Sequence, residues 1–263
     1  MHNIVKQKIF LYDNHTHTNI SPLVESIDEI VNTCRTKHII YNCVGTNLKD
    51  SIIACQQAKK YSDTIRCMVG IHPDECNDLN DIHAIENLYL QNKEHIVAIG
   101  EIGLDYYGIN KDKEKQKHFF KLLIELANKY ALPMCIHVRD AELDCLELLQ
   151  NVKYPNKVCI HCFTGDKWLA KKYIERGYVI SVSGIVTFKN ALSLHEAIKY
   201  IPLDKMLVET DGPWLSPYPY RGKTNYPYYV EYVANNIANR LNIDPQELFK
   251  QLVENTYNFY QIS

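Results

Sequence analysis

Glycine and proline are scarce in this chain, with ten of each among 263 residues, which argues against a modular protein rich in linkers. No run of about 18 apolar residues occurs, so no membrane-spanning helix is expected. The first ten residues lack the basic start and the long apolar stretch of a signal peptide. We therefore expect a cytoplasmic globular protein without a membrane partner.

Neither sign of charge dominates, because 29 basic residues stand against 31 acidic ones. Any electrostatic attraction to nucleic acid must therefore come from a local patch of basic residues or from bound metal ions. The nine cysteines are scattered, and without an export signal we expect reduced thiols that are mostly buried. Cys159 and Cys162 are close in sequence, but an extended strand would point them to opposite faces, which disfavours a shared metal ion.

Short apolar runs rich in β-branched residues recur along the chain and alternate with stretches of helical periodicity. Such runs suit parallel strands that are buried on both faces. Eight strands, each followed by a helix, within about 250 residues are typical of a (β/α)8 TIM barrel. We expect one such domain over residues 1–263. The expected strands span residues 9–12, 38–44, 65–69, 96–99, 133–137, 158–161, 178–182 and 206–209.

Two helix starts carry capping signals. Ser26 precedes an amphipathic stretch, and Glu29 three residues later would complete a capping box. Asp244 and Pro245 predict the N-cap and first residue of an added C-terminal helix. The alternative fold, a doubly wound open sheet, usually has a glycine-rich loop after its first strand, where this chain instead has the run DNHTH at residues 13–17.

The first expected strand leads into His15 and His17. Side chains two residues apart share a face of an extended chain, so both rings can point at one metal ion. A lone histidine is usually structural, but two at this spacing directly after an apolar strand favour ligation. We interpret both as metal ligands.

Four further strands also end in side chains of the kinds that bind metals. The carboxyl ends of barrel strands carry the active site in this architecture. Glu101 follows an apolar run, where a carboxylate is costly to bury unless a cation compensates it, so it either bridges two ions or forms a salt bridge at the rim. Packing alone does not readily explain six such groups at five strand ends. The six are His15, His17, Glu101, His137, His161 and Asp211.

The charge of such a centre can be estimated. Four neutral histidines with two carboxylates and two divalent ions would carry a net charge of about +2 before solvent is added. That charge suits an anionic substrate and a metal-bound hydroxide. Ligation rich in histidine favours zinc, manganese or iron over magnesium, although the residues do not identify the metal.

These residues stand in motifs that resemble those of the TatD family of metal-dependent deoxyribonucleases, within the amidohydrolase-like metal barrels. The motifs occur in the family's order from about residue 10 to about residue 225. The resemblance implies a (β/α)8 barrel with two divalent ions that hydrolyses DNA phosphodiester bonds, commonly as a 3′→5′ exonuclease. The matching pieces are HTH at 15–17, GIHP at 70–73, GEIGLDY at 100–106, HVRDA at 137–141, HCFTG at 161–165, ETD at 209–211 and RGK at 221–223.

The resemblance also implies which residues hold which ion, with Glu101 as the bridge between them. One ion would be held by His15, His17, Glu101 and Asp211, and the other by Glu101, His137 and His161.

The expected reaction is attack of a metal-bound hydroxide on phosphorus, in line with the leaving sugar oxygen. Glu101 and Asp211 are the expected catalytic residues, and Asp211 is the candidate to accept the water's proton, unless it is only a ligand. Substrate phosphates would be held by cationic or hydrogen-bonding side chains, although each of these could equally be structural. The candidates are His72, Arg139, Arg221 and Lys223.

We expect DNA that is single-stranded or has a free 3′ end as the substrate. The aromatic rings of residues 214–220, Tyr218 among them, could stack on unpaired bases or pack the loop onto the barrel. A barrel of this size can act as a monomer.

Two other functions stay open. The same metal barrel could hydrolyse an amide or ester bond, for example in aminoacyl-RNA, because a fold does not determine a substrate. Many amidohydrolases bridge their metals with a modified lysine on the fourth strand, and Glu101 at that place favours the nuclease. A metal-stabilised binding protein without turnover is the remaining alternative, and the presence of all six ligand candidates argues against it.

Overall fold

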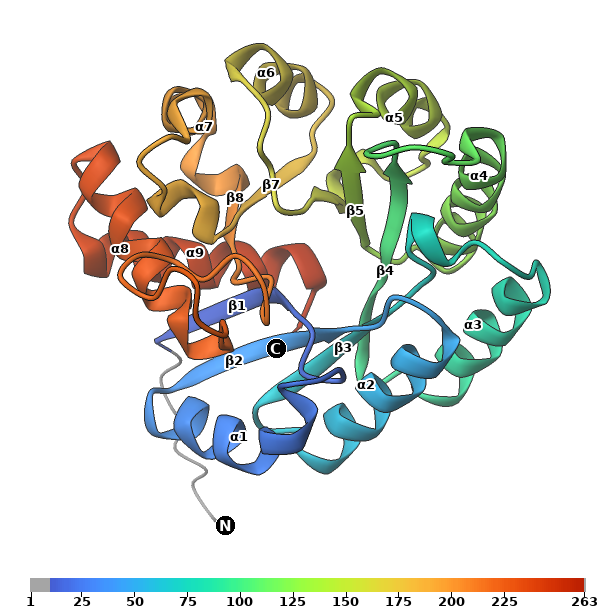
Figure 1. Ribbon diagram of the computed structural model, residues 1–263, viewed down its shortest axis with the longest axis horizontal. Coiled ribbons are helices and arrows are strands. Elements are labelled where there is room, and N and C mark those ends of the chain that lie inside the picture. The colour runs from blue at the N-terminus through green and yellow to red at the C-terminus, as the bar shows by residue number, and fades with distance from the viewer. Residues whose placement is uncertain (1–9, 263) are drawn as a thin grey trace.

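The computed structural model describes residues 10–262, which form a ring of parallel strands surrounded by helices (Figure 1). The predicted TIM barrel is confirmed, and its eight strands lie in the order of the sequence. The strands are β1 (Leu11–Thr16), β2 (Ile39–Val44), β3 (Ile65–Val69), β4 (Ile96–Asp105), β5 (Met134–Arg139), β6 (Val158–Ile160), β7 (Val179–Val182) and β8 (Met206–Val208).

Each strand pairs in parallel with the next, from β1 with β2 to β7 with β8. The barrel is nearly closed, because backbone bonds join the end of β1 to the segment after β8. The Asp211 N–H donates to the His15 carbonyl at 2.8 Å, and the His17 N–H donates to the Gly212 carbonyl at 2.7 Å. We call this junction the β1–β8 seam. It lies at the carboxyl ends of the strands, where the predicted ligands stand.

The expected strands and the observed ones differ mainly in length. The first was expected from residue 9, which lies outside the described residues, and β1 continues through Thr16. The fourth was expected to end at residue 99, but β4 continues to Asp105, because Ile102 to Asp105 pair with Ile136 to Arg139 of β5. This extension carries Glu101 along the strand instead of leaving it in a loop.

Helices pack around the outside of the strands (Figure 1). The amphipathic stretch predicted after Ser26 is helix α1, which buries Ile30, Val31 and Cys34, and α4 likewise buries Phe119 and Leu123. Burying each large apolar side chain contributes about 1.5–3 kcal/mol. The helices are α1 (Ile27–Thr36), α2 (Leu48–Lys60), α3 (Asn80–Gln91), α4 (Lys113–Tyr130), α5 (Glu142–Leu148), α6 (Lys167–Glu175), α7 (Leu192–Ala197), α8 (Val230–Leu241) and α9 (Pro245–Tyr260).

The two capping predictions have opposite outcomes. The Asp244 side chain accepts the N–H groups of residues 246 and 247, at 2.9 and 3.1 Å, and Pro245 begins α9 as expected. The capping box at Ser26 is wrong, because its hydroxyl donates to the Leu23 carbonyl and caps nothing. A 3-10 turn, Val24–Ser26, leads directly into α1, so the chain enters this helix from a helical turn and not from an extended residue.

Inside the barrel, small and apolar side chains fill the space beneath the histidines. Cys135 of β5 and Cys159 of β6 stand two residues before His137 and His161, and pack in a cluster with Phe259 of α9. All nine cysteines are free thiols, and only Cys162 is partly exposed, as expected. None of the helices within residues 10–262 is long and apolar enough to cross a membrane.

Candidate metal centre

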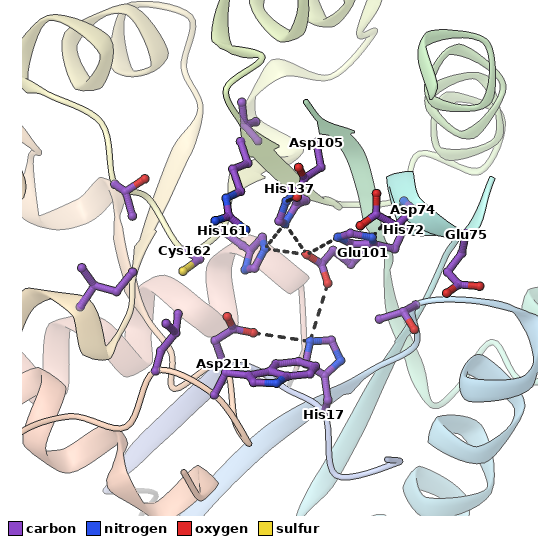
Figure 2. Close-up of a pocket in the computed structure, with 17 residues that line it drawn as sticks. His17, His72, Asp74, Glu75, Glu101, Asp105, His137, His161, Cys162 and Asp211 are labelled. Atoms are coloured by element: carbon purple, nitrogen blue, oxygen red, sulfur yellow. Dashed lines mark hydrogen bonds and ion pairs between the residues drawn. The ribbon is translucent and has the colours of Figure 1, made fainter. Parts of the chain in front are cut away.

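The six predicted ligands come together at one mouth of the barrel, where a cavity of about 860 Å³ opens (Figure 2). Glu101 is the central side chain, and Figure 2 shows it with His137 on one side and His17 on the other. Its Oε1 lies 2.7 Å from His137 Nδ1 and 2.8 Å from His161 Nε2. Its Oε2 lies 3.5 Å from His15 Nε2 and 3.7 Å from His17 Nε2. Each oxygen therefore faces a different pair of histidines.

Asp211 completes the group on the Oε2 side. The Nε2 atoms of His15 and His17 are 3.1 Å apart and lie 3.9 and 3.5 Å from Asp211 Oδ1. Ligand atoms bound to one zinc ion at about 2.0–2.2 Å lie roughly 3–4 Å from one another. The separations therefore fit an ion on this side. On the Oε1 side, His137 Nδ1 and His161 Nε2 are 3.3 Å apart, and both lie within hydrogen-bond distance of Glu101 Oε1. A second ion bound here would replace these two contacts.

A close approach of β4 and β5 brings His137 next to Glu101. Gly103 has a φ of +146°, and a Cβ there would lie 2.0 Å from the His137 carbonyl oxygen. Only glycine fits this position, because a side chain would push the two strands apart. Gly103 therefore allows β4 and β5 to approach closely enough for Glu101 and His137 to meet.

The charges around Glu101 compensate for its burial. Burial alone would raise the pKa of the Glu101 carboxyl, but the charge of His161 and the hydrogen bond from His137 hold it well below its usual value. Burial likewise opposes ionisation of Asp211, yet its hydrogen bond with His17 lowers the pKa. Both carboxylates are therefore held in the charged form that binds cations.

Comparison with known proteins identifies the family of this chain. A family model described as TatD-related DNase matches residues 12–261. The chain belongs to the TatD-related DNase family. An uncharacterized metal-dependent hydrolase of Mycoplasma genitalium is 36% identical over 263 residues, covering 95% of this chain and 98% of the relative. The uncharacterized metal-dependent hydrolase YcfH of Escherichia coli K12 is 33% identical over 260 residues, covering 97% of each.

Solved structures of TatD proteins share the barrel. The TatD homologue YjjV of Escherichia coli K12 superposes with a TM-score of 0.91 at 22% identity, covering 96% of this chain and 98% of that one. A TatD-family hydrolase of Entamoeba histolytica superposes with a TM-score of 0.89 at 22% identity, covering 98% and 100%. At these identities the likeness establishes the fold. The family resemblance inferred from the motifs is confirmed, and the chain is a metal-dependent hydrolase of the TatD family.

Two carboxylates of this TatD site were not predicted as functional residues. Asp105 Oδ2 lies 3.0 Å from His137 Nε2, and Glu209 Oε1 lies 3.2 Å from His161 Nδ1. Each accepts from the ring nitrogen that faces away from Glu101, which orients the imidazole. The alternation of side chains along a strand could have predicted both. Asp105 is four residues from Glu101 and Glu209 is two residues from Asp211, so each shares a face of an extended chain with a ligand.

The backbone orients His17 in a similar way. His17 Nδ1 donates to the Val44 carbonyl at 2.9 Å, which turns Nε2 toward the centre. His15 differs, because its Nδ1 lies 3.2 Å from the sulfur of Cys135. Burial lowers the pKa of His15, so this ring is held in the neutral form that binds metal.

His72, predicted as a phosphate contact, lies beside Glu101. Its Nε2 is 3.8 Å from Glu101 Oε1, while its Nδ1 accepts the Asp74 N–H at 3.1 Å. Burial lowers the pKa of His72 to about 4, so the ring is neutral. Because Nδ1 accepts, the single ring proton is on Nε2, which faces Glu101. His72 also stands in a group with Asp105 and His137 whose atoms are close enough to share one ion.

The three predicted cations have different positions. Arg139 lines the cavity, and its guanidinium carbon lies 3.6 Å from the centre of the Tyr107 ring. Arg221 stacks at 3.6 Å on Phe188, outside the described cavity lining. Lys223 is exposed and also lies outside that lining. Of the three, only Arg139 is placed against the space that Glu101 faces.

Proposed function

We propose that this TatD protein hydrolyses phosphodiester bonds in DNA, removing nucleotides from the 3′ end of a single strand. The observation that carries the proposal is the position of Glu101, whose two oxygens face two separate sets of ligand atoms. A carboxylate that bridges two cations is a usual element of two-metal sites that cut phosphate esters.

The proposed ligands follow from these distances. Bound divalent ions would supply Lewis acidity to the phosphoryl group and activate a water as the nucleophile. The histidine-rich donors favour zinc, manganese or iron. We assign one ion to His15, His17, Asp211 and Glu101, and the other to Glu101, His137 and His161.

Asp211 is the proposed proton acceptor. Its Oδ1 faces His15 and His17, whereas its Oδ2 receives no hydrogen bond from any described residue. One carboxylate oxygen is thus directed toward the cluster, and the other can take a proton from the attacking water. The lowered pKa of Asp211 keeps this group ionised before the reaction.

Arg139 is the proposed contact to a substrate phosphate. It is the one lysine or arginine among the described residues that line the cavity. A guanidinium offers two parallel N–H donors to a phosphate. The Tyr107 ring beneath it restricts its motion, which lowers the entropy lost when the phosphate binds.

The test uses end-labelled single-stranded DNA with purified protein. We expect shortening from the 3′ end that stops with chelator, returns with Mn²⁺ or Mg²⁺, and is absent from Glu101→Ala. Glu94→Ala is the matched control, because that carboxylate is 82% exposed at the surface. Failure to cut DNA with any divalent ion, together with turnover of ester or amide substrates such as aminoacyl-RNA, would contradict the proposal.

A further inference from the structure

The walls of the cavity differ in chemistry. Asp74 and Glu75 stand at one side, near the end of β3 (Figure 2). The loops after β7 and β8 supply Ile185, Trp214 and Leu215, which are uncharged. If the anionic group of a substrate lies at Glu101 and the proposed ions, an apolar group next to it would contact these three residues.

Trp214 is held firmly although its ring is open to solvent. Its N–H donates to the Asp211 carbonyl at 3.1 Å, and its carbonyl accepts the side-chain amide of Asn225 at 2.6 Å. The residue is 50% exposed, and its ring meets the His17 ring at 65°, with centroids 5.2 Å apart. Its backbone is therefore fixed three residues after a proposed ligand, while half of its surface remains free to contact another molecule.

The neighbouring loops support this position. Leu215 approaches Gly184 so closely that a Cβ on the glycine would lie 2.2 Å from the Leu215 carbonyl oxygen. The Tyr218 N–H donates to the hydroxyl of Thr187 at 2.9 Å. These contacts join the loop after β8 to the 3-10 turn Gly184–Thr187, so that Ile185 and Trp214 line the same cavity.

We propose that Trp214, with Ile185 and Leu215, forms a subsite for the nucleobase of the terminal nucleotide whose phosphodiester reaches Glu101. This inference rests on the proposed function and names the part of the substrate that the site recognises besides phosphate. Every base offers a flat aromatic face, so stacking on tryptophan tolerates any sequence. A base paired within a duplex cannot take this position, so the subsite selects unpaired ends.

Charge beyond the cavity favours the same orientation. At the end of β3, Asp74 is ion-paired with Lys111, and the Glu75 carboxylate beside it has no cationic partner among the described residues, so Glu75 repels a phosphate backbone. Arg221 and Lys223, on the loop that also carries Trp214, have no carboxylate partner among the described residues. A strand that leaves the centre over this loop therefore meets cations, whereas one that leaves over the end of β3 meets carboxylates.

The two tryptophans of the chain permit a direct test. Trp168 on α6 is 51% exposed and lies outside the described cavity lining, so Trp168→Phe leaves Trp214 as the fluorescent reporter. Short single strands with non-cleavable linkages are titrated onto the metal-loaded protein, either with a terminal base or with an abasic terminal nucleotide. We expect the base-containing strand to quench Trp214 and to bind roughly 5- to 150-fold more tightly than the abasic strand.

Two substitutions complete the test. Trp214→Ala should bind both strands with equal affinity, whereas Trp168→Ala should keep the preference for the terminal base. Equal binding of both strands by the unaltered protein, which requires no variant to fold, would overturn the subsite. Persistence of the preference in Trp214→Ala would also overturn it. Either result would leave the proposed function standing if 3′ shortening of DNA continues, whereas loss of that shortening in the unaltered protein would overturn the proposed function.

Discussion

Two buried carboxylates, Asp105 and Glu209, determine how two imidazoles face the centre. They accept from the outer ring nitrogens of His137 and His161. Glu209 has no exposed surface, and it also accepts the Cys162 N–H at 2.7 Å. It therefore fixes both the ring of His161 and the turn that follows β6. An orienting carboxylate of this kind makes the inner ring nitrogen a better donor to a cation.

Replacing Glu209 with glutamine removes the charge but keeps an oxygen that can accept the Cys162 N–H. We expect metal affinity to fall about 10- to 100-fold, because His161 loses its anionic partner. Competition with a fluorescent chelator measures this affinity without a turnover assay. Glu196→Gln, at a carboxylate that is 62% exposed, serves as the control. Equal affinities in Glu209→Gln and the control would show that Glu209 does not orient a ligand.

At the level of single residues, the sequence predicted the convergence of the ligands better than the groups around them. Each ligand candidate follows an apolar run, and parallel strands bring such ends together. The neighbours of Glu101 depend on three-dimensional detail that the pattern does not contain. His72 reaches Glu101 through the path of a loop, and Arg139, the last residue of β5, stacks on Tyr107 in the loop that follows β4. Loop paths like these are not encoded by periodicity.

Among the secondary-structure elements, α9 supports the β1–β8 seam. Asn14 of β1 donates to the Val208 carbonyl of β8 at 2.9 Å and to the Thr256 hydroxyl of α9 at 3.1 Å. Asn255 of α9 donates to the Met206 carbonyl at 2.8 Å. Helix α9 is thus hydrogen-bonded to the two strands that close the barrel. A substitution that destabilises α9 should therefore also lower the free energy of unfolding of the barrel.

The start of α9 gives a matched pair of substitutions. Asp244→Ala removes an acceptor for two N–H groups, and we expect it to lower the free energy of unfolding by about 0.5–2 kcal/mol. Ser26→Ala changes the residue at the N-cap position of α1, but that side chain makes no capping bond, so its effect should stay within about 0.5 kcal/mol. Urea unfolding of both variants measures the difference. Equal losses would contradict the assigned cap.

The elements also show where sequence patterns mislead. The helix at Ser26 has the residues of a capping box, but the chain enters it from a 3-10 turn. The backbone before Ser26 therefore prevents the capping hydrogen bond that the side chains alone would predict. The strand β4 runs through the sequence GEIGLD, whose glycines and charges are typical of a loop. Pairing with β5 keeps it extended, and such pairing is a tertiary effect that a local pattern does not reveal.

For the whole molecule, metal removal should measure how far the barrel depends on its ions. A ligand that binds only the folded state stabilises it by about 2.7 kcal/mol at 100 times its dissociation constant. For a protein of this size, such an energy corresponds to roughly 5–10 °C in Tm. We expect chelation to lower the Tm of the unaltered protein by about that amount and to leave Glu101→Ala unchanged. Equal melting of the unaltered protein with and without chelator would contradict a metal-loaded native state.

The β1–β8 seam has a consequence for the time at which activity first arises. His15 and His17 are synthesised well before Asp211 and β8, the strand that closes the ring. A nascent or prematurely terminated chain that stops before β8 lacks both Asp211 and the bonds that close the ring. The chain must therefore extend past β8 before all six proposed ligands can come together at the mouth of the barrel.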